Sequence, residues 1–192
     1  MAIENKFLDS ITKPFNLELP EADTMDQYLD FIVPAVRPWG EDLREEEFYL
    51  DTRWLEIRDN DDSLESILYI FRTEEELLIS IDGNISRGVW RRLEKSNTLI
   101  VEQTVDGSIV KSELFDLAFL NKDFFILLKH GDQRRKGKNK YFVLGRESVV
   151  KKLEWREAME LLFNRFRNNS QFMTMSAVIV LIIVAFILFS IL

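Results

Sequence analysis

The sequence has no cysteine, only 7 glycines and 4 prolines in 192 residues, and a single histidine. Without cysteine the chain cannot form a disulfide, a thiol nucleophile or a cysteine-based zinc site. The glycines are isolated from one another, so there is no glycine-rich loop of the kind that holds phosphate groups. These absences exclude several common classes of enzyme and metalloprotein.

The remaining polar side chains do not form a recognisable catalytic pattern. A single histidine, His130, cannot supply a two-histidine metal site, and no Gly-x-Ser-x-Gly sequence offers a nucleophile for it to activate. Runs of glutamate occur at 45–47 and 74–76, in segments that we interpret as solvated turns and connectors. The sequence therefore predicts a protein that is not an enzyme and that binds neither a cofactor nor a metal.

One long stretch, Met173–Leu192, has no charged residue, proline or glycine. Twenty helical residues at ~1.5 Å each span ~30 Å, the thickness of the hydrocarbon core of a bilayer. We expect this stretch to be a single transmembrane helix at the end of a tail-anchored protein. The first residues of the chain lack the apolar run of a signal peptide.

The charges predict how such a protein is oriented. Residues 1–120 contain 27 acidic and 12 basic side chains, a net charge of −15, whereas residues 121–192 contain 6 and 13, a net charge of +7. Positive side chains before a membrane span favour the cytoplasmic side. We therefore expect the domain that precedes the span to be cytoplasmic. The cations nearest to the span are Lys151, Lys152, Arg156, Arg165 and Arg167.

Between residues 48 and 146, short apolar runs alternate with turn sequences at intervals of about ten residues. Asp82-Gly83 and Asp106-Gly107 are typical of two-residue hairpin turns, because glycine adopts positive φ without strain. Several runs also alternate apolar and polar residues with the period of a strand. The expected strands are Tyr49–Arg58, Ser66–Arg72, Leu77–Ile81, Gly88–Leu93, Thr98–Thr104, Ile109–Phe119, Phe124–Lys129 and Tyr141–Leu144.

The fold class that follows is mainly β, an antiparallel meander closed into a barrel or bent sheet, because closure removes exposed strand edges. An N-terminal helix through about Val36, begun by Asp23-Thr24, and a C-terminal amphipathic helix complete it. The expected core residues are Trp54, Tyr69, Phe71, Leu77, Ile79, Trp90 and Phe125. The expected domains are an arm with a short helix at 1–47, the barrel at 48–146, an amphipathic helix at 147–170 and the anchor at 173–192.

The order of these strands resembles a known family. Trp54, Tyr69-Ile-Phe71, Leu77-Leu-Ile-Ser80, Gly83, Gly88-Val-Trp90, Leu99-Ile-Val101 and Tyr141-Phe-Val143 are similar to the pattern of small bacterial lipocalin-like β-meander domains. This resemblance implies a β-barrel, with or without a bound apolar ligand, and it brings no catalytic residues. Trp155 on a helix after the strands also resembles the closing helix of pleckstrin-homology-type domains.

A basic stretch, 134–140, joins the last two expected strands. It has no aromatic residues to stack on bases, so we do not expect it to bind nucleic acid. It is either a solvated turn or a contact for anionic headgroups or an acidic protein. The candidate membrane or partner contacts are Arg134, Arg135, Lys136, Lys138, Lys140, Lys151, Lys152 and Arg156.

Two functions remain open at this point. One is a membrane-tethered interaction module, an adaptor or an accessory subunit of a complex at the bilayer. The other is a barrel that binds an apolar ligand or a lipid headgroup. Dense apolar runs such as Phe124–Leu128 are more typical of a filled core than of a lined cavity, and they favour the interaction module.

Overall fold

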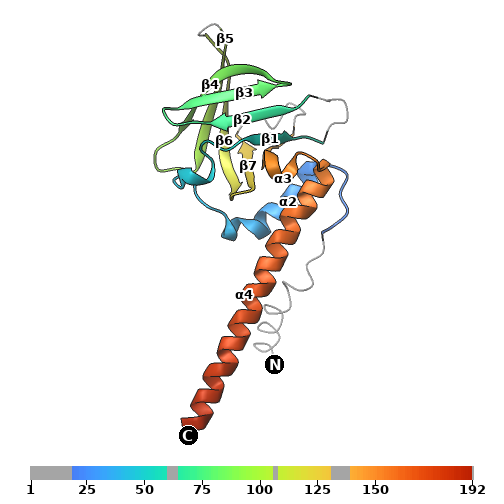
Figure 1. Ribbon diagram of the computed structural model, residues 1–192, viewed down its shortest axis with the longest axis vertical. Coiled ribbons are helices and arrows are strands. Elements are labelled where there is room, and N and C mark those ends of the chain that lie inside the picture. The colour runs from blue at the N-terminus through green and yellow to red at the C-terminus, as the bar shows by residue number, and fades with distance from the viewer. Residues whose placement is uncertain (1–18, 60–64, 106–107, 131–138, 192) are drawn as a thin grey trace. The chain divides into compact units, whose positions relative to one another are not determined.

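The computed structural model describes residues 19–59, 65–105, 108–130 and 139–191 (Figure 1). The chain divides into a compact unit of residues 21–159 and a second unit that includes residues 160–192. The first 18 residues of the expected N-terminal arm lie outside the described residues.

The first unit contains a closed antiparallel barrel in which the strands follow one another in sequence order, from β1 to β8 (Figure 1). The barrel closes because β1 pairs with β8 as well as with β2. All eight expected strands are present, and the predicted meander and its closure are confirmed. Their bounds are β1 Trp54–Ile57, β2 Ile67–Phe71, β3 Glu76–Ile81, β4 Asn84–Arg92, β5 Thr98–Val105, β6 Ser108–Leu120, β7 Phe124–Lys129 and β8 Tyr141–Arg146.

The turn between β3 and β4 has the geometry that its sequence predicts. Asp82 and Gly83 have φ values of 49° and 89°, the two consecutive positive angles of a type I′ hairpin turn. This turn sets the pairing of Ile81 with Asn84 and hence the register of the two strands. In this register Leu77 and Ile79 of β3 and Trp90 of β4 are buried in the core.

Aromatic side chains fill the interior. All seven predicted core residues are buried, with at most 6% of their surface exposed. The Phe125 ring lies 5.5 Å from the rings of Tyr49 and Phe71 and 5.8 Å from the Trp54 ring. The Trp54 indole donates a hydrogen bond of 3.0 Å to the Tyr49 carbonyl, so its polar N–H is satisfied within the core.

The N-terminal helix, α2, spans Met25–Val36 and is followed by 3₁₀ turns at Arg37–Trp39 (η1) and Glu46–Phe48 (η2). Thr24 caps it as expected, because its hydroxyl accepts a hydrogen bond from the Gln27 backbone. The Asp26 carboxylate accepts backbone hydrogen bonds from Lys140 and Tyr141. These bonds attach α2 to the start of β8.

The segment after β8 differs from the prediction of one helix from Glu147. A short helix, α3 Glu147–Val150, ends before residues 151–154, and α4 Trp155–Ile191 begins a new helix. The side chain of Glu157 accepts a hydrogen bond of 2.9 Å from the backbone N–H of Glu154. This bond is half of a capping box, which fixes the helix start without any proline or glycine.

The second unit contains most of α4. Within the residues whose positions are described, no helix combines the length and the apolar character needed to cross a membrane.

Gly88 lies where β4 approaches β5 closely, and we expect Gly88→Ala to destabilise the barrel. A Cβ atom at this position would lie 2.4 Å from the Glu102 carbonyl oxygen, a backbone atom that moves only with its strand. The expected loss is about 1–3 kcal/mol of unfolding free energy, measured by urea denaturation followed by circular dichroism. Arg87→Ala, on an exposed side chain of the same strand, is the control. Equal stability of the two variants would contradict the close approach.

Candidate functional site

Of the predicted basic contact residues, Arg134, Arg135, Lys136 and Lys138 lie outside the described residues. Lys140, which is described, makes an ion pair with Asp30 of α2. Burial alone would raise the pKa of Asp30, but hydrogen bonds from Lys140 and Tyr141 hold it below its ordinary value. Lys140 therefore contributes to the attachment of α2 to the barrel.

Two of the other three predicted cations make contacts within the first unit. Lys151 makes a 3.1 Å ion pair with Glu147, whose pKa is lowered by hydrogen bonds from Arg53 and from Lys151. Arg156 donates a 2.8 Å hydrogen bond to the Ala22 carbonyl, and its guanidinium lies 4.3 Å from the centroid of the Trp155 ring. Lys152, the third, is exposed.

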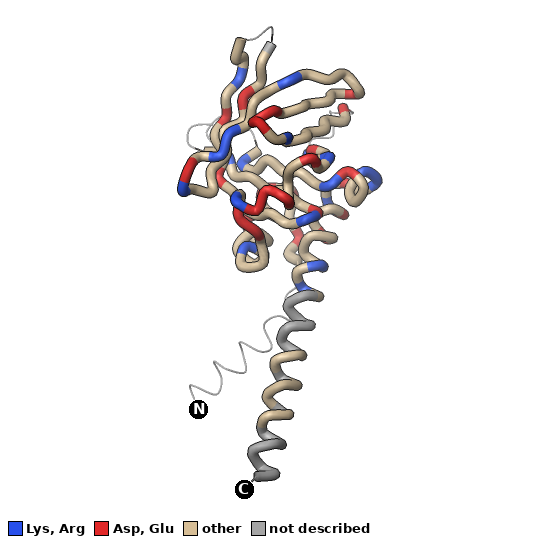
Figure 2. Tube along the Cα trace, turned by 60° about the vertical axis from the view of Figure 1, so that its left-hand side comes forward, with Lys and Arg blue, Asp and Glu red and all other residues tan. Residues whose placement is uncertain are grey.

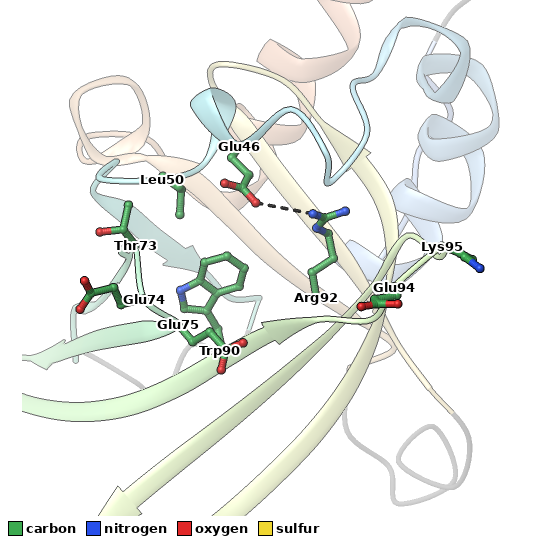
Figure 3. Close-up of a pocket in the computed structure, with 9 residues that line it drawn as sticks. All are labelled: Glu46, Leu50, Thr73, Glu74, Glu75, Trp90, Arg92, Glu94 and Lys95. Atoms are coloured by element: carbon green, nitrogen blue, oxygen red, sulfur yellow. Dashed lines mark ion pairs between the residues drawn. The ribbon is translucent and has the colours of Figure 1, made fainter.

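A hollow of about 510 Å³ lies in the barrel unit, where η2 faces the β2–β3 turn and the β4–β5 connection (Figure 3). We call it the glutamate hollow. Its volume is in the range of ligand pockets. Its lining residues are Glu46, Leu50, Thr73, Glu74, Glu75, Trp90, Arg92, Glu94 and Lys95.

Trp90 separates the hollow from the barrel core. Its ring makes edge-to-face contacts with Tyr49 and Phe71, at centroid distances of 5.6 and 6.1 Å. Its indole N–H donates a hydrogen bond of 2.8 Å to the Arg72 carbonyl, which fixes the orientation of the ring. Trp90 and Leu50 give the hollow an apolar floor.

The hollow is rimmed by charges that are only partly paired. Glu46 makes an ion pair of 3.6 Å with Arg92, and Glu75 makes one of 3.8 Å with Arg91. Within the described parts of the chain, the carboxylates of Glu74 and Glu94 have no ion pair. Figure 3 shows Lys95 directed away from the Trp90 ring. The lining therefore has an excess of negative charge.

The turns that form the rim adopt an uncommon backbone conformation. Glu74, Glu75 and Lys95 have φ values of 62°, 62° and 60°, in the left-handed region where residues other than glycine are uncommon. Sequence reasoning identified the glutamate run but interpreted it as a solvated turn. The sequence does not show that η2 lies beside this turn, because the two segments are far apart along the chain and meet only in the folded barrel unit.

Glu56 is half-buried and lies two residues after Trp54, on the same face of β1. It accepts a hydrogen bond of 3.1 Å from the Tyr69 hydroxyl. Burial raises the pKa of Glu56 and that of Tyr69, and burial lowers the pKa of Lys129 on β7. Sequence analysis missed Glu56, although the period of two from Trp54 was the signal that places it on this face.

We expect Glu56→Gln to alter the pH dependence of stability. Because the pKa of Glu56 is raised in the folded protein, the folded state binds this proton more tightly than the unfolded chain does. As pH rises through the raised pKa, the proton is lost and the free energy of unfolding decreases. Glutamine retains an acceptor for Tyr69 and does not ionise. As pH rises from the ordinary titration range of a carboxyl toward neutrality, the variant should gain stability relative to the parent.

The measurement is urea unfolding of both proteins across this pH range. Carboxyls with lowered pKa values, such as Asp30 and Glu147, act in the opposite direction but are common to both proteins. The difference between the two curves therefore reports on Glu56. Parallel curves would show that Glu56 is not buried in the folded state.

Figure 2 shows Asp and Glu spread over several turns and connectors of the barrel unit. Even so, among the described residues no three His, Cys, Asp or Glu side chains are grouped so as to hold a metal ion.

Comparison of the chain with models of known protein families, with curated proteins and with solved structures finds no match.

Proposed function

We propose that this chain is an interaction module whose barrel is tethered to a membrane by Met173–Leu192. The barrel holds a partner protein near the bilayer, as an adaptor or accessory subunit does. The proposal joins two features of the chain. They are a barrel with a filled interior and an uncharged apolar stretch that lies outside the barrel unit.

The main support for the proposed membrane tether is the exposure of large apolar side chains in the second unit. Ile179, Val180, Leu181, Ile183 and Val184 each expose between 47% and 60% of their surface. Contiguous exposed apolar groups of this kind are typical of protein or membrane contact sites. The surrounding sequence has no ionisable residue from Met173 to Leu192, which favours the lipid environment.

The basic residues near this stretch support a cytoplasmic position for the barrel. Arg165 and Arg167 precede the apolar stretch, and the sequence from 121 onward has a net charge of +7. Cations beside a span favour the cytoplasmic side and attract anionic headgroups by ~1 kcal/mol each. Contact of the basic stretch 134–140 with anionic headgroups or an acidic partner is part of the same proposal.

The packed interior favours an interaction module over a carrier of apolar ligands. A lipocalin-like carrier holds its ligand inside the barrel. Here the rings of Trp54, Phe71 and Phe125 occupy the interior together with Tyr49 and Trp90. The lipocalin-like ligand-binding function remains the second candidate, and the experiment below distinguishes the two.

The test uses the full chain, synthesised without cells in the presence of phosphatidylcholine vesicles. We expect it to float with the vesicles in a density gradient and to remain with them after alkaline carbonate extraction. Recovery of the chain in the soluble fraction, before carbonate extraction and without detergent, would overturn the proposed tether. Native mass spectrometry of the full chain, purified from cells in detergent, then separates the candidates. A retained small apolar molecule would favour the carrier, and a co-purifying protein would favour the interaction module.

A further inference from the structure

We propose that the glutamate hollow is the site at which this module takes a lysine- or arginine-bearing segment of its partner. The inference rests on the proposed interaction function and adds to it a location and a partner chemistry. The hollow supplies two complementary features, namely an apolar floor and carboxylates at the rim.

The apolar floor matches the stem of a long cationic side chain. Lysine and arginine bury their methylene groups on apolar surface while the charged end stays near water. Trp90 and Leu50 provide such a surface, and the hydrogen bond from the Trp90 indole to Arg72 holds the ring in place. A fixed floor reduces the ordering cost of binding.

The rim supplies the charge. Arg92 and Arg91 already pair with Glu46 and Glu75. Glu74 and Glu94 line the same hollow, and they have no ion pair in the described parts of the chain. A cationic group above the floor would be attracted by both carboxylates, whereas an anionic ligand would be repelled.

Arg92 lines the hollow, where its side chain is 30% exposed and pairs with Glu46. Its Nε atom is buried, and no hydrogen-bond partner for it is present in the described structure. A buried donor without an acceptor is uncommon in folded proteins, and leaving it unpaired is costly. This atom is closed to a ligand in the hollow, so the apolar floor and the rim carboxylates favour a basic peptide.

The test follows the indole N–H of Trp90 by NMR in full-length protein labelled at its 4 tryptophans and held in neutral detergent. The probe is the capped tripeptide acetyl-Lys-Lys-Lys-amide, and the charge-reversed control is acetyl-Glu-Glu-Glu-amide. We expect the Trp90 signal to move saturably with the lysine peptide, less at high salt, and not with the glutamate peptide. Trp90→Phe assigns the signal by its loss.

Matched variants separate the hollow from the general negative charge of the barrel. Glu74→Gln with Glu94→Gln should weaken binding about three- to tenfold, as expected for the loss of two exposed charge contacts. Glu21→Gln with Glu47→Gln makes the same change in net charge at exposed positions outside the lining and should leave binding unchanged.

Two results would overturn the proposal. One is a Trp90 signal that does not respond to the lysine peptide. The other is equal weakening in the two pairs of variants, which would show that only long-range attraction operates. Either result leaves vesicle flotation untouched, so failure of this site is distinguishable from failure of the proposed tether.

Discussion

Trp54→Ala should remove about 3–5 kcal/mol from the free energy of unfolding, a large part of the 5–15 kcal/mol typical of a whole domain. Trp54 is fully buried, and its position in β1 pairs with Tyr69 of β2 on one side and with Arg146 of β8 on the other. Truncation creates a cavity where the barrel closes. It also leaves the Tyr49 carbonyl without the indole donor.

Urea unfolding of the full chain in neutral detergent, followed by near-ultraviolet circular dichroism, measures this loss. Trp39→Ala is the matched control, because the Trp39 side chain is 39% exposed. The control should lose clearly less stability than Trp54→Ala. Similar losses in both variants would mean that Trp54 does not occupy the centre of the core.

The strands of this fold were predictable because their signals are local. Alternation of apolar residues with period two identifies strands such as Leu77–Ile81, and Asp82-Gly83 marks the turn that follows. Closure into a barrel follows from the number of consecutive hairpins and from the need to protect strand edges. The break between α3 and α4 was missed, because a capping contact from Glu157 leaves a weaker signal than proline or glycine.

The glutamate hollow was not predictable, since its parts are distant in sequence. Glu46 comes from the connector before β1, Glu74 from the β2–β3 turn and Glu94 from the β4–β5 connection. Each residue alone has the character of a solvated carboxylate. Only the closed sheet brings these three segments together around Trp90.

The predicted basic contacts show what a run of charge leaves out. Lys140 and Arg156 were identified from their charge, as possible contacts for a membrane or partner. In the structure, Lys140 pairs with Asp30, and Arg156 donates to the Ala22 carbonyl. A run of charge in sequence does not reveal which cations are used within the fold, since that depends on where α2 packs.

Replacing Ile183 and Val184 together by arginine should abolish retention of the chain on neutral vesicles. A charged residue near the centre of a membrane-spanning helix costs roughly 2.5–3.5 kcal/mol, so two cost roughly 5–7 kcal/mol. Residues 183 and 184 lie near the middle of the uncharged stretch and are both exposed. Phosphatidylcholine vesicles carry no net charge, so the new arginines gain no attraction to the surface.

The matched control makes the same chemical change in the barrel unit. Ile109 and Val110 on β6 are 57% and 59% exposed, so Ile109→Arg with Val110→Arg replaces the same two residue types at accessible positions. The control should float with the vesicles as the parent does, and the 183/184 variant should remain at the bottom of the gradient. Flotation of both variants would place the membrane contact outside the 173–192 stretch. Loss of both would show that the substitutions act through the solubility of the chain, because the control leaves the proposed span unchanged.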